Sequence, residues 1–172
     1  TYNDLYWNPG GNPDLKPETS LQGEIGNSFK WRNFDLDLIA YYLNIKDMIR
    51  WLPASGGVWR PQNEDEVGSY GFEGLLGWTK HIGDGFLRLK GIYSYTVSEN
   101  QKTGKQLIYV PYHKVTGSAG YSYGRWNFDY QLLFNGEVFT RSNNDSKYNL
   151  DAYTISNFST SYAFGHEKSY RL

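Results

Sequence analysis

Apolar and polar residues alternate at every second position along most of this chain between Thr19 and Phe164. A period of two indicates β-strands, because successive side chains of a strand point to opposite faces. The pattern therefore predicts an all-β protein whose strands each carry one apolar and one polar face. The clearest case places Phe34, Leu36, Leu38, Ala40 and Tyr42 on one face and Asp35, Asp37, Ile39 and Tyr41 on the other.

The connections between these stretches alternate between short and long. Short turns such as Arg32-Asn33 and Gly124-Arg125 require antiparallel neighbours. Short turns at one end and longer loops at the other are typical of a transmembrane β-barrel, whose long loops are extracellular. The alternation predicts about seven strands, at 19–31, 34–50, 68–80, 86–97, 112–123, 126–140 and 151–164, with long loops at 51–67, 98–111 and 141–150.

The flanks complete the predicted organisation of residues 1–172 as one partial barrel domain. Residues 1–18 contain three of the chain's six prolines and are expected to form an extracellular loop, while 165–172 form a turn, beginning at Gly165-His166-Glu167, and the start of another strand. Seven strands cannot close a bacterial barrel, which has an even number. Open edges would leave unpaired backbone groups in lipid at several kcal/mol each. We therefore predict an up-and-down barrel of which this chain forms a part.

Composition supports a membrane barrel and excludes other classes. The chain has 16 Tyr, 9 Phe and 6 Trp, a supply that suits aromatic girdles at both lipid-water boundaries. Its 17 basic and 18 acidic residues are scattered, so no nucleic-acid partner is predicted. No apolar run approaches the roughly 18 residues of a transmembrane helix. Cysteine is absent, which excludes disulfides and thiolate metal sites.

Candidate chemistry in the sequence is weak, and no catalytic residue, metal or cofactor is predicted. Gly120-Tyr121-Ser122-Tyr123-Gly124 fits the pattern of a hydrolase nucleophile elbow, but that motif requires a helix where another strand is expected here. The histidines, at 81, 113 and 166, occur singly. The segment Asn143-Asn144-Asp145 with Asp151 is oxygen-rich but lacks the spacing of a calcium loop.

Four segments, in one order along the chain, resemble TonB-dependent outer-membrane receptors. Gly11-Asn12-Pro13-Asp14-Leu15-Lys16-Pro17-Glu18 is similar to the family's Asn-Pro-x-Leu-x-Pro-Glu segment before a late strand. The others are Ala40-Tyr41-Tyr42-Leu43-Asn44-Ile45-Lys46-Asp47-Met48-Ile49, the stretch 63–77 with Gly71-Phe72-Glu73, and Val110-Pro111-Tyr112-His113-Lys114. By position, the chain resembles roughly strands 14 to 20 of a 22-stranded barrel with a plugged lumen.

This resemblance implies a multi-pass barrel in the outer membrane of a Gram-negative cell. The implied activity is uptake of a scarce ligand, a siderophore, haem, cobalamin or glycan, driven by energy that the TonB complex transmits. The implied partners are the lipid bilayer, a small-molecule or metal-chelate ligand, and the TonB complex through an amino-terminal plug region outside this chain. The resemblance also allows a surface lipoprotein as a partner.

Ligand contacts are expected near the bases of the long loops, which would face outward. Aromatic and charged residues there are the candidates, although Trp and Tyr at strand tops more often anchor the barrel at the membrane boundary. The candidate ligand-binding residues are Trp51, Trp59, Arg60, Tyr109, Phe139 and Arg141.

Two other classes share part of the pattern. A soluble secreted β-sandwich, such as a carbohydrate-binding module, would also alternate and carry turn glycines. The predicted strands of about 12 to 15 residues, however, exceed the usual 5 or 6 of globular sheets. A diffusion porin would show the same strands without the four ordered segments.

Overall fold

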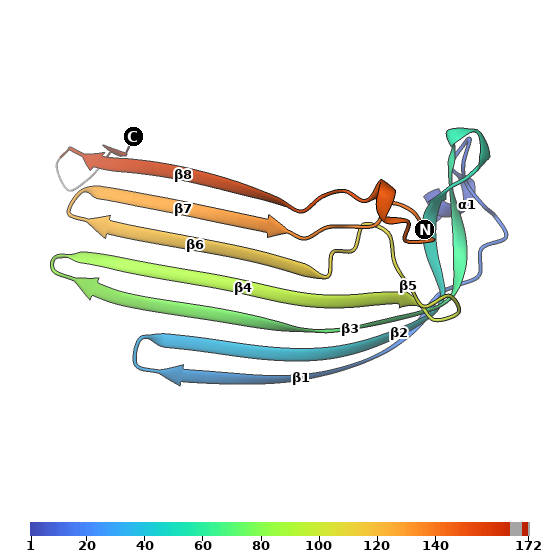
Figure 1. The fold of residues 1–172 in the computed structure, drawn as a ribbon. Helices are drawn as coiled ribbons and strands as arrows, with labels where there is room; N and C mark the ends of the chain where they lie inside the picture. The colour runs from blue at the N-terminus through green and yellow to red at the C-terminus, as the bar shows by residue number, and fades with distance from the viewer. Residues whose placement is uncertain (166–169, 172) are drawn as a thin grey trace.

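The computed structural model describes residues 1–165, 170 and 171, which form one antiparallel sheet (Figure 1). Its strands run in the order β1-β2-β3-β4-β6-β7-β8-β9, and β5 pairs with β4. The bounds are α1 Tyr2–Tyr6, β1 Thr19–Trp31, β2 Phe34–Pro53, η1 Ser55–Gly57, β3 Trp59–Ile82, β4 Gly85–Asn100, β5 Lys105–Gln106, β6 His113–Tyr123, β7 Trp126–Asn135, η2 Ser146–Tyr148, β8 Tyr153–Phe164 and β9 Tyr170–Arg171.

The seven long strands, β1 to β4 and β6 to β8, correspond to the seven predicted from the sequence. Short turns join β1 to β2, β3 to β4 and β6 to β7 at one end, and the long connections gather at the other (Figure 1). The short β9 pairs with the end of β8, as expected for the start of another strand. The predicted turn residues His166 and Glu167 lie outside the described residues.

The register keeps the predicted apolar faces together across the whole sheet. Residues directly opposite one another in an antiparallel pair share a face. Trp31 pairs with Phe34, Phe34 with Trp78, and Trp78 with Leu89. We call the side that carries this row the apolar face. The opposite, polar face carries charged residues on four neighbouring strands, among them Asp37, Glu73, Arg88, Lys90 and Lys114.

Most apolar side chains of the sheet are exposed or half-buried rather than packed in a core. Every residue of β1 is exposed, and Leu21, Ile25 and Phe29 each exceed half of their full exposure. No second sheet faces this one among the described residues, so the β-sandwich alternative is wrong for the fold. The few buried apolar residues include Val67, Leu107, Ile108 and Val138, near the long connections.

The predicted loop at 51–67 is wrong, because most of it is strand. β2 continues to Pro53 and β3 begins at Trp59, leaving a turn in which Gly56 and Gly57 adopt positive φ. The two-residue alternation of apolar residues ends near residue 46, yet backbone pairing continues to the Pro53–Trp59 pair. Backbone hydrogen bonds do not require an apolar face, so a strand can continue beyond its last alternating apolar residue without a periodic signal in the sequence.

Other bounds also differ from the prediction. β7 ends at Asn135 rather than at 140, and the amide of Gly136 donates instead to the carbonyl of His113. The predicted loop at 98–111 contains the end of β4 and all of β5. Residues 1–18 contain the short helix α1, whose first turn is capped by Thr1 and Asp4. None of the helices in the described part of the chain is long and apolar enough to cross a membrane.

Candidate functional site

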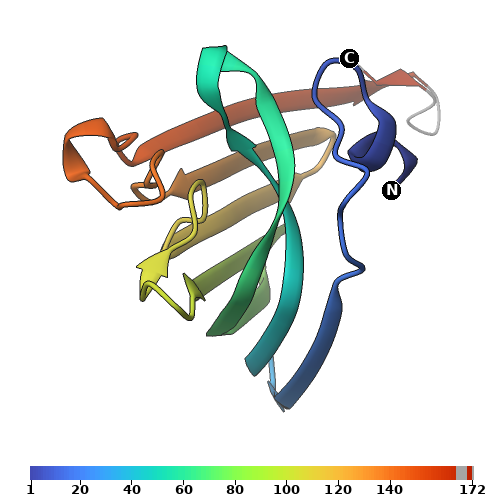
Figure 2. The same cartoon turned by 90° about the vertical axis from the view of Figure 1, so that its right-hand side faces the viewer.

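Four parts of the chain meet at the end that carries the long connections, onto which Figure 2 looks. They are the N-terminal segment (1–18), the hairpin tip (47–65, the ends of β2 and β3 with their turn), the first loop (101–112) and the second loop (136–152). The hairpin tip stands between the N-terminal segment and the first loop (Figure 2). All six predicted ligand residues lie in these parts.

Asn63 fastens the N-terminal segment to the hairpin tip. Its Oδ1 accepts from the amide of Lys16 at 2.9 Å, and its Nδ2 donates to the carbonyls of Lys16 at 3.0 Å and Asp47 at 2.6 Å. Glu18 adds a contact by accepting from the amide of Ile49 at 3.2 Å. Three of the four segments that carry the sequence resemblance therefore meet at one side chain.

Trp51 is held by the N-terminal segment. Its indole Nε1 donates to Asp4 Oδ1 at 2.9 Å. Hydrogen bonds from the amine and hydroxyl of Thr1 and from Trp51 lower the pKa of the Asp4 carboxyl to about 2. Gly10 lies so close that a Cβ there would come within 2.6 Å of the Trp59 carbonyl oxygen and 3.2 Å of the Trp51 ring. The glycine therefore allows the segment to lie against the hairpin tip.

Gln106 and Asn144 join the first loop to the second. The amide of Gln106 donates to Asn144 Oδ1 at 2.9 Å, and Asn144 Nδ2 donates back to the carbonyl of Gln106 at 2.9 Å. The Gln106 side chain, only 2% exposed, accepts from the amide of Ser98 at 2.8 Å and donates to the carbonyl of Val110 at 3.2 Å. The two loops therefore form one hydrogen-bonded unit.

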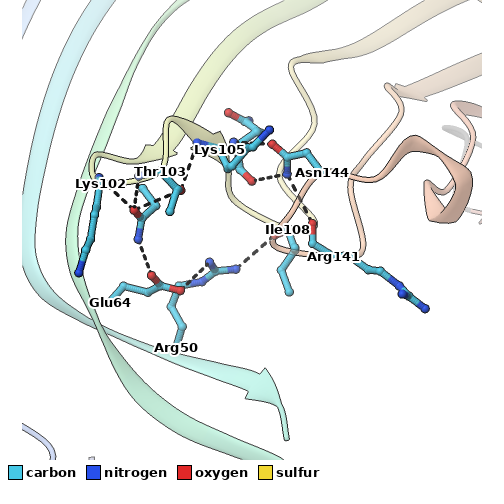
Figure 3. Close-up of polar contacts among 10 residues, drawn as sticks. Arg50, Glu64, Lys102, Thr103, Lys105, Ile108, Arg141 and Asn144 are labelled. Atoms are coloured by element: carbon cyan, nitrogen blue, oxygen red, sulfur yellow. Dashed lines mark hydrogen bonds and ion pairs between the residues drawn. The ribbon is translucent and has the colours of Figure 1, made fainter.

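A half-buried ionic cluster links the hairpin tip to the first loop (Figure 3). Arg50 Nη1 lies 3.9 Å from Glu64 Oε1, with only 14% and 18% of the two side chains exposed. Asn100 Nδ2 donates to Glu64 Oε2 at 2.6 Å, and Arg50 Nη2 donates to the carbonyl of Ile108 at 3.5 Å. These residues border a cavity of about 80 Å³. The hydrogen bonds satisfy charges that would otherwise be costly to bury.

The structure divides the six predicted ligand residues into two groups. Trp51, Trp59 and Arg60 lie on the hairpin tip, where Trp59 is 42% exposed and Arg60 is exposed. Tyr109, Phe139 and Arg141 lie on the joined loops, and the amide of Tyr109 donates to the carbonyl of Phe139 at 2.9 Å.

The loop group offers exposed aromatic and cationic side chains. Tyr109 is 50% exposed, and Phe139 packs edge-on against Tyr112, whose hydroxyl pKa is raised, chiefly by burial. The guanidinium carbon of Arg141 lies 3.4 Å from the centre of the Tyr148 ring. Figure 3 shows the Arg141 side chain pointing away from Arg50 and Glu64.

Sequence reasoning missed the residues that organise this end. Arg50, Glu64 and Gln106 carry no motif, because each has a partner 36 or more residues away in the sequence. The sequence places Asn144 only within an oxygen-rich segment, yet its side-chain amide bonds the backbone of Gln106 in the first loop. In the same segment, Asp145 Oδ1 accepts from the amide of Lys147 at 3.1 Å. Among the described residues, no group of three or more His, Asp and Glu side chains could hold a metal ion.

The residues of the weaker chemical motifs make structural contacts. Ser122 lies inside β6, and its hydroxyl donates to Asn127 Oδ1 on β7 at 2.8 Å, so the strand-turn-helix geometry of a nucleophile elbow is missing. His113 Nδ1 lies 2.8 Å from the Tyr93 hydroxyl. His81 packs against Phe86 with ring centres 4.9 Å apart.

Sequence comparison identifies relatives across the whole chain. A family model described as TonB dependent receptor-like, beta-barrel, matches residues 1–172. The vitamin B12 transporter BtuB of Photobacterium profundum is 32% identical over 166 residues, covering 94% of this chain and 26% of that protein. A BtuB of Vibrio vulnificus is 46% identical over 74 residues, covering 42% of this chain and 12% of that protein. The chain thus spans about a quarter of the length of the first relative.

Solved structures share the fold. The siderophore receptor PirA from Acinetobacter baumannii superimposes with a TM-score of 0.66 at 22% identity, covering 90% of this chain and 27% of that one. The copper transporter OprC gives a TM-score of 0.70 at 14% identity, covering 89% and 24%. The relatives are transporters and receptors rather than enzymes. By the family model and these relatives, the chain belongs to the TonB-dependent receptor-like β-barrel family of the bacterial outer membrane.

Proposed function

We propose that this chain forms part of the wall and the outer loops of a transporter that binds a scarce extracellular ligand and imports it with energy transmitted by TonB. The observation that carries the proposal is the joined end of the sheet. There the hairpin tip and both loops are fastened to one another by Arg50, Glu64, Gln106 and Asn144. Such a preorganised platform lowers the ordering cost of binding a ligand.

Among the family's ligand classes we propose a cobalamin first. The relative that covers 94% of this chain at 32% identity is named a vitamin B12 transporter. The siderophore receptor and the copper transporter are 22% and 14% identical to this chain, which supports a shared fold alone. Half-exposed aromatic rings such as Trp59 and Tyr109 suit the apolar surface of a large ring system, and Arg60 and Arg141 suit anionic groups.

All six predicted residues remain proposed ligand contacts, but the geometry ranks them. Trp51 has its indole N–H engaged by Asp4, so its structural role is the better supported. Tyr109 is half-exposed on the joined loops, and Arg141 points away from Arg50 and Glu64 (Figure 3), so these two residues rank first. The TonB contact, the plug and a surface lipoprotein are proposed as partners of the full-length protein.

Uptake by the full-length protein tests this proposal. It would be produced in a bacterial strain that lacks its own cobalamin transporter, and labelled cyanocobalamin, ferric siderophore, haem and a maltooligosaccharide would be supplied in turn. We expect cobalamin uptake that disappears when TonB is deleted. TonB-dependent uptake of a different compound would overturn the ligand, and uptake that persists without TonB would overturn energised import.

A further inference from the structure

A groove of about 460 Å³ crosses the apolar face close to the short turns. Phe34, Trp78 and Leu89 belong to the row that starts at the turn between β1 and β2, and Leu76 and Gly91 belong to the next row away from the turns. Because this face meets lipid in an outer-membrane barrel, the groove opens towards the bilayer. Its lining consists of Phe34, Leu76, Trp78, Leu89, Lys90 and Gly91, of which Lys90 alone alternates to the polar face.

Glycine forms the floor of the groove. Gly91 lies directly opposite Gly117 on β6, and a Cβ built on Gly91 would meet no atom within 4 Å. The walls are aromatic and aliphatic, with the Phe34 and Trp78 ring centres 5.9 Å apart. Empty apolar space forfeits dispersion contacts on both sides, and a flexible hydrocarbon chain can restore them.

Two cations stand beside the groove at the water boundary. Arg32 lies in the turn between β1 and β2, with its guanidinium carbon 5.2 Å from the Trp31 ring, which in turn stacks on Phe34. Lys80 is exposed and follows Trp78 by two residues on the same face of β3. The acid nearest in sequence to Lys80 is Asp84, in the next turn.

The turn that carries Arg32 is fixed against β3. Asn33 Nδ2 donates to the carbonyl of Thr79 at 2.5 Å, and the amide of Thr79 donates to the carbonyl of Asn33 at 3.0 Å. These bonds hold the turn next to Trp78, one wall of the groove. Toward the short turns the groove has apolar walls, then the aromatic row of Trp31, Phe34 and Trp78, and then two cations. These features match, in the same order, the acyl chain, the interfacial region and the phosphate of a membrane lipid.

We propose that this groove binds one acyl chain of a glycerophospholipid whose anionic phosphate is held by Arg32 and Lys80. The site lies at the end opposite to the proposed ligand platform, so it is independent of the transported substrate. The two cations bind the anionic headgroup, and the shape of the groove accommodates the acyl chain. An uncharged lipid with the same chains should therefore bind more weakly than an anionic one.

Native mass spectrometry of the full-length protein in a neutral detergent tests the groove. The probes are phosphatidylglycerol and a diacylglycerol with identical chains. We expect the wild type to retain one phosphatidylglycerol more strongly than the diacylglycerol. Gly91→Leu fills the groove and should weaken that retention roughly tenfold. The matched control is Gly23→Leu, which adds the same side chain at an open position on the same face of β1 and should change nothing.

The phosphate contact is tested separately. Arg32→Gln with Lys80→Gln should remove the preference for phosphatidylglycerol over diacylglycerol, whereas Arg125→Gln, in the turn between β6 and β7, should keep it. Equal retention by wild type and both glycine variants overturns the groove. Equal retention of the two lipids by wild type overturns the phosphate site. If Gly91→Leu does not fold, the exposed charge variants decide, and an unchanged preference in them counts against the proposal.

Discussion

Leu89 and Leu132 show how much depends on which face a single residue occupies. Both lie on the apolar face, whereas Ser94 lies on the polar face between Glu73 and Lys114. We expect Leu132→Arg to destabilise the full-length barrel by about 2 to 4 kcal/mol and Leu89→Arg, which lies nearer the short turns, by less, while Ser94→Arg is tolerated. Folding into lipid vesicles measures the difference, and equal stability of the three variants would show that the faces are assigned wrongly.

Asn144 combines an unusual backbone conformation with a paired amide. Its φ is 54°, and its side chain holds the backbone of Gln106. Asn144→Ala loses the amide and strains the backbone, whereas Asn144→Gly loses the amide alone. We expect local destabilisation of about 1 to 3 kcal/mol for alanine and less for glycine, seen as faster hydrogen exchange at the Gln106 amide. Protection that survives in both variants would mean that the loops are not joined there.

Tyr109 provides the sharpest test of the ligand contacts. It is 50% exposed on the first loop, and Tyr123, 52% exposed at the short-turn end, is its matched control. We expect Tyr109→Ala to weaken binding of the transported ligand by about 1 to 3 kcal/mol, with Tyr123→Ala near wild type. Equilibrium binding to the purified full-length protein gives both values. Equal effects of the two substitutions would remove Tyr109 from the binding site.

The hairpin of β2 and β3 is the element in which sequence and structure disagree most. Within the membrane, the alternation of apolar and polar residues predicts both strands, because the face that contacts lipid requires apolar residues. Above it the pairing continues through Arg50, Gln62 and Pro53, where no such demand exists. A loop was therefore predicted where the backbone is extended and paired.

Docking of the N-terminal segment on this hairpin depends on Asn63. We expect Asn63→Ala to release residues near Lys16, since three hydrogen bonds to the backbone disappear. Limited proteolysis of the full-length protein should then cleave within 1–18 faster than in wild type. Gln62→Ala, at the exposed neighbouring position, is the control. Cleavage at the wild-type rate in Asn63→Ala would contradict this role.

At the scale of the whole molecule, the sheet is incomplete. β1 forms one edge, and among the described residues only the two of β9 pair with β8 on its other side. Unpaired strand edges are unfavourable in lipid. We expect residues 1–172 alone not to form a stable membrane barrel, unlike the full-length protein. Heat-modified gel mobility after mixing with lipid vesicles measures this, and a heat-resistant folded band from the isolated chain would contradict it.

The sequence by itself determined the strand type, the seven long strands, their apolar faces and the end at which the long connections gather. It could do so because the bilayer imposes a periodic demand on every second residue of each strand. Only the tertiary structure decided how far the paired β2–β3 hairpin extends beyond the alternating stretch and where the N-terminal segment docks. It also decided how the loops are joined through Arg50, Glu64, Gln106 and Asn144. Those contacts join residues distant in the chain through individual hydrogen bonds, which leave no periodic trace in the sequence.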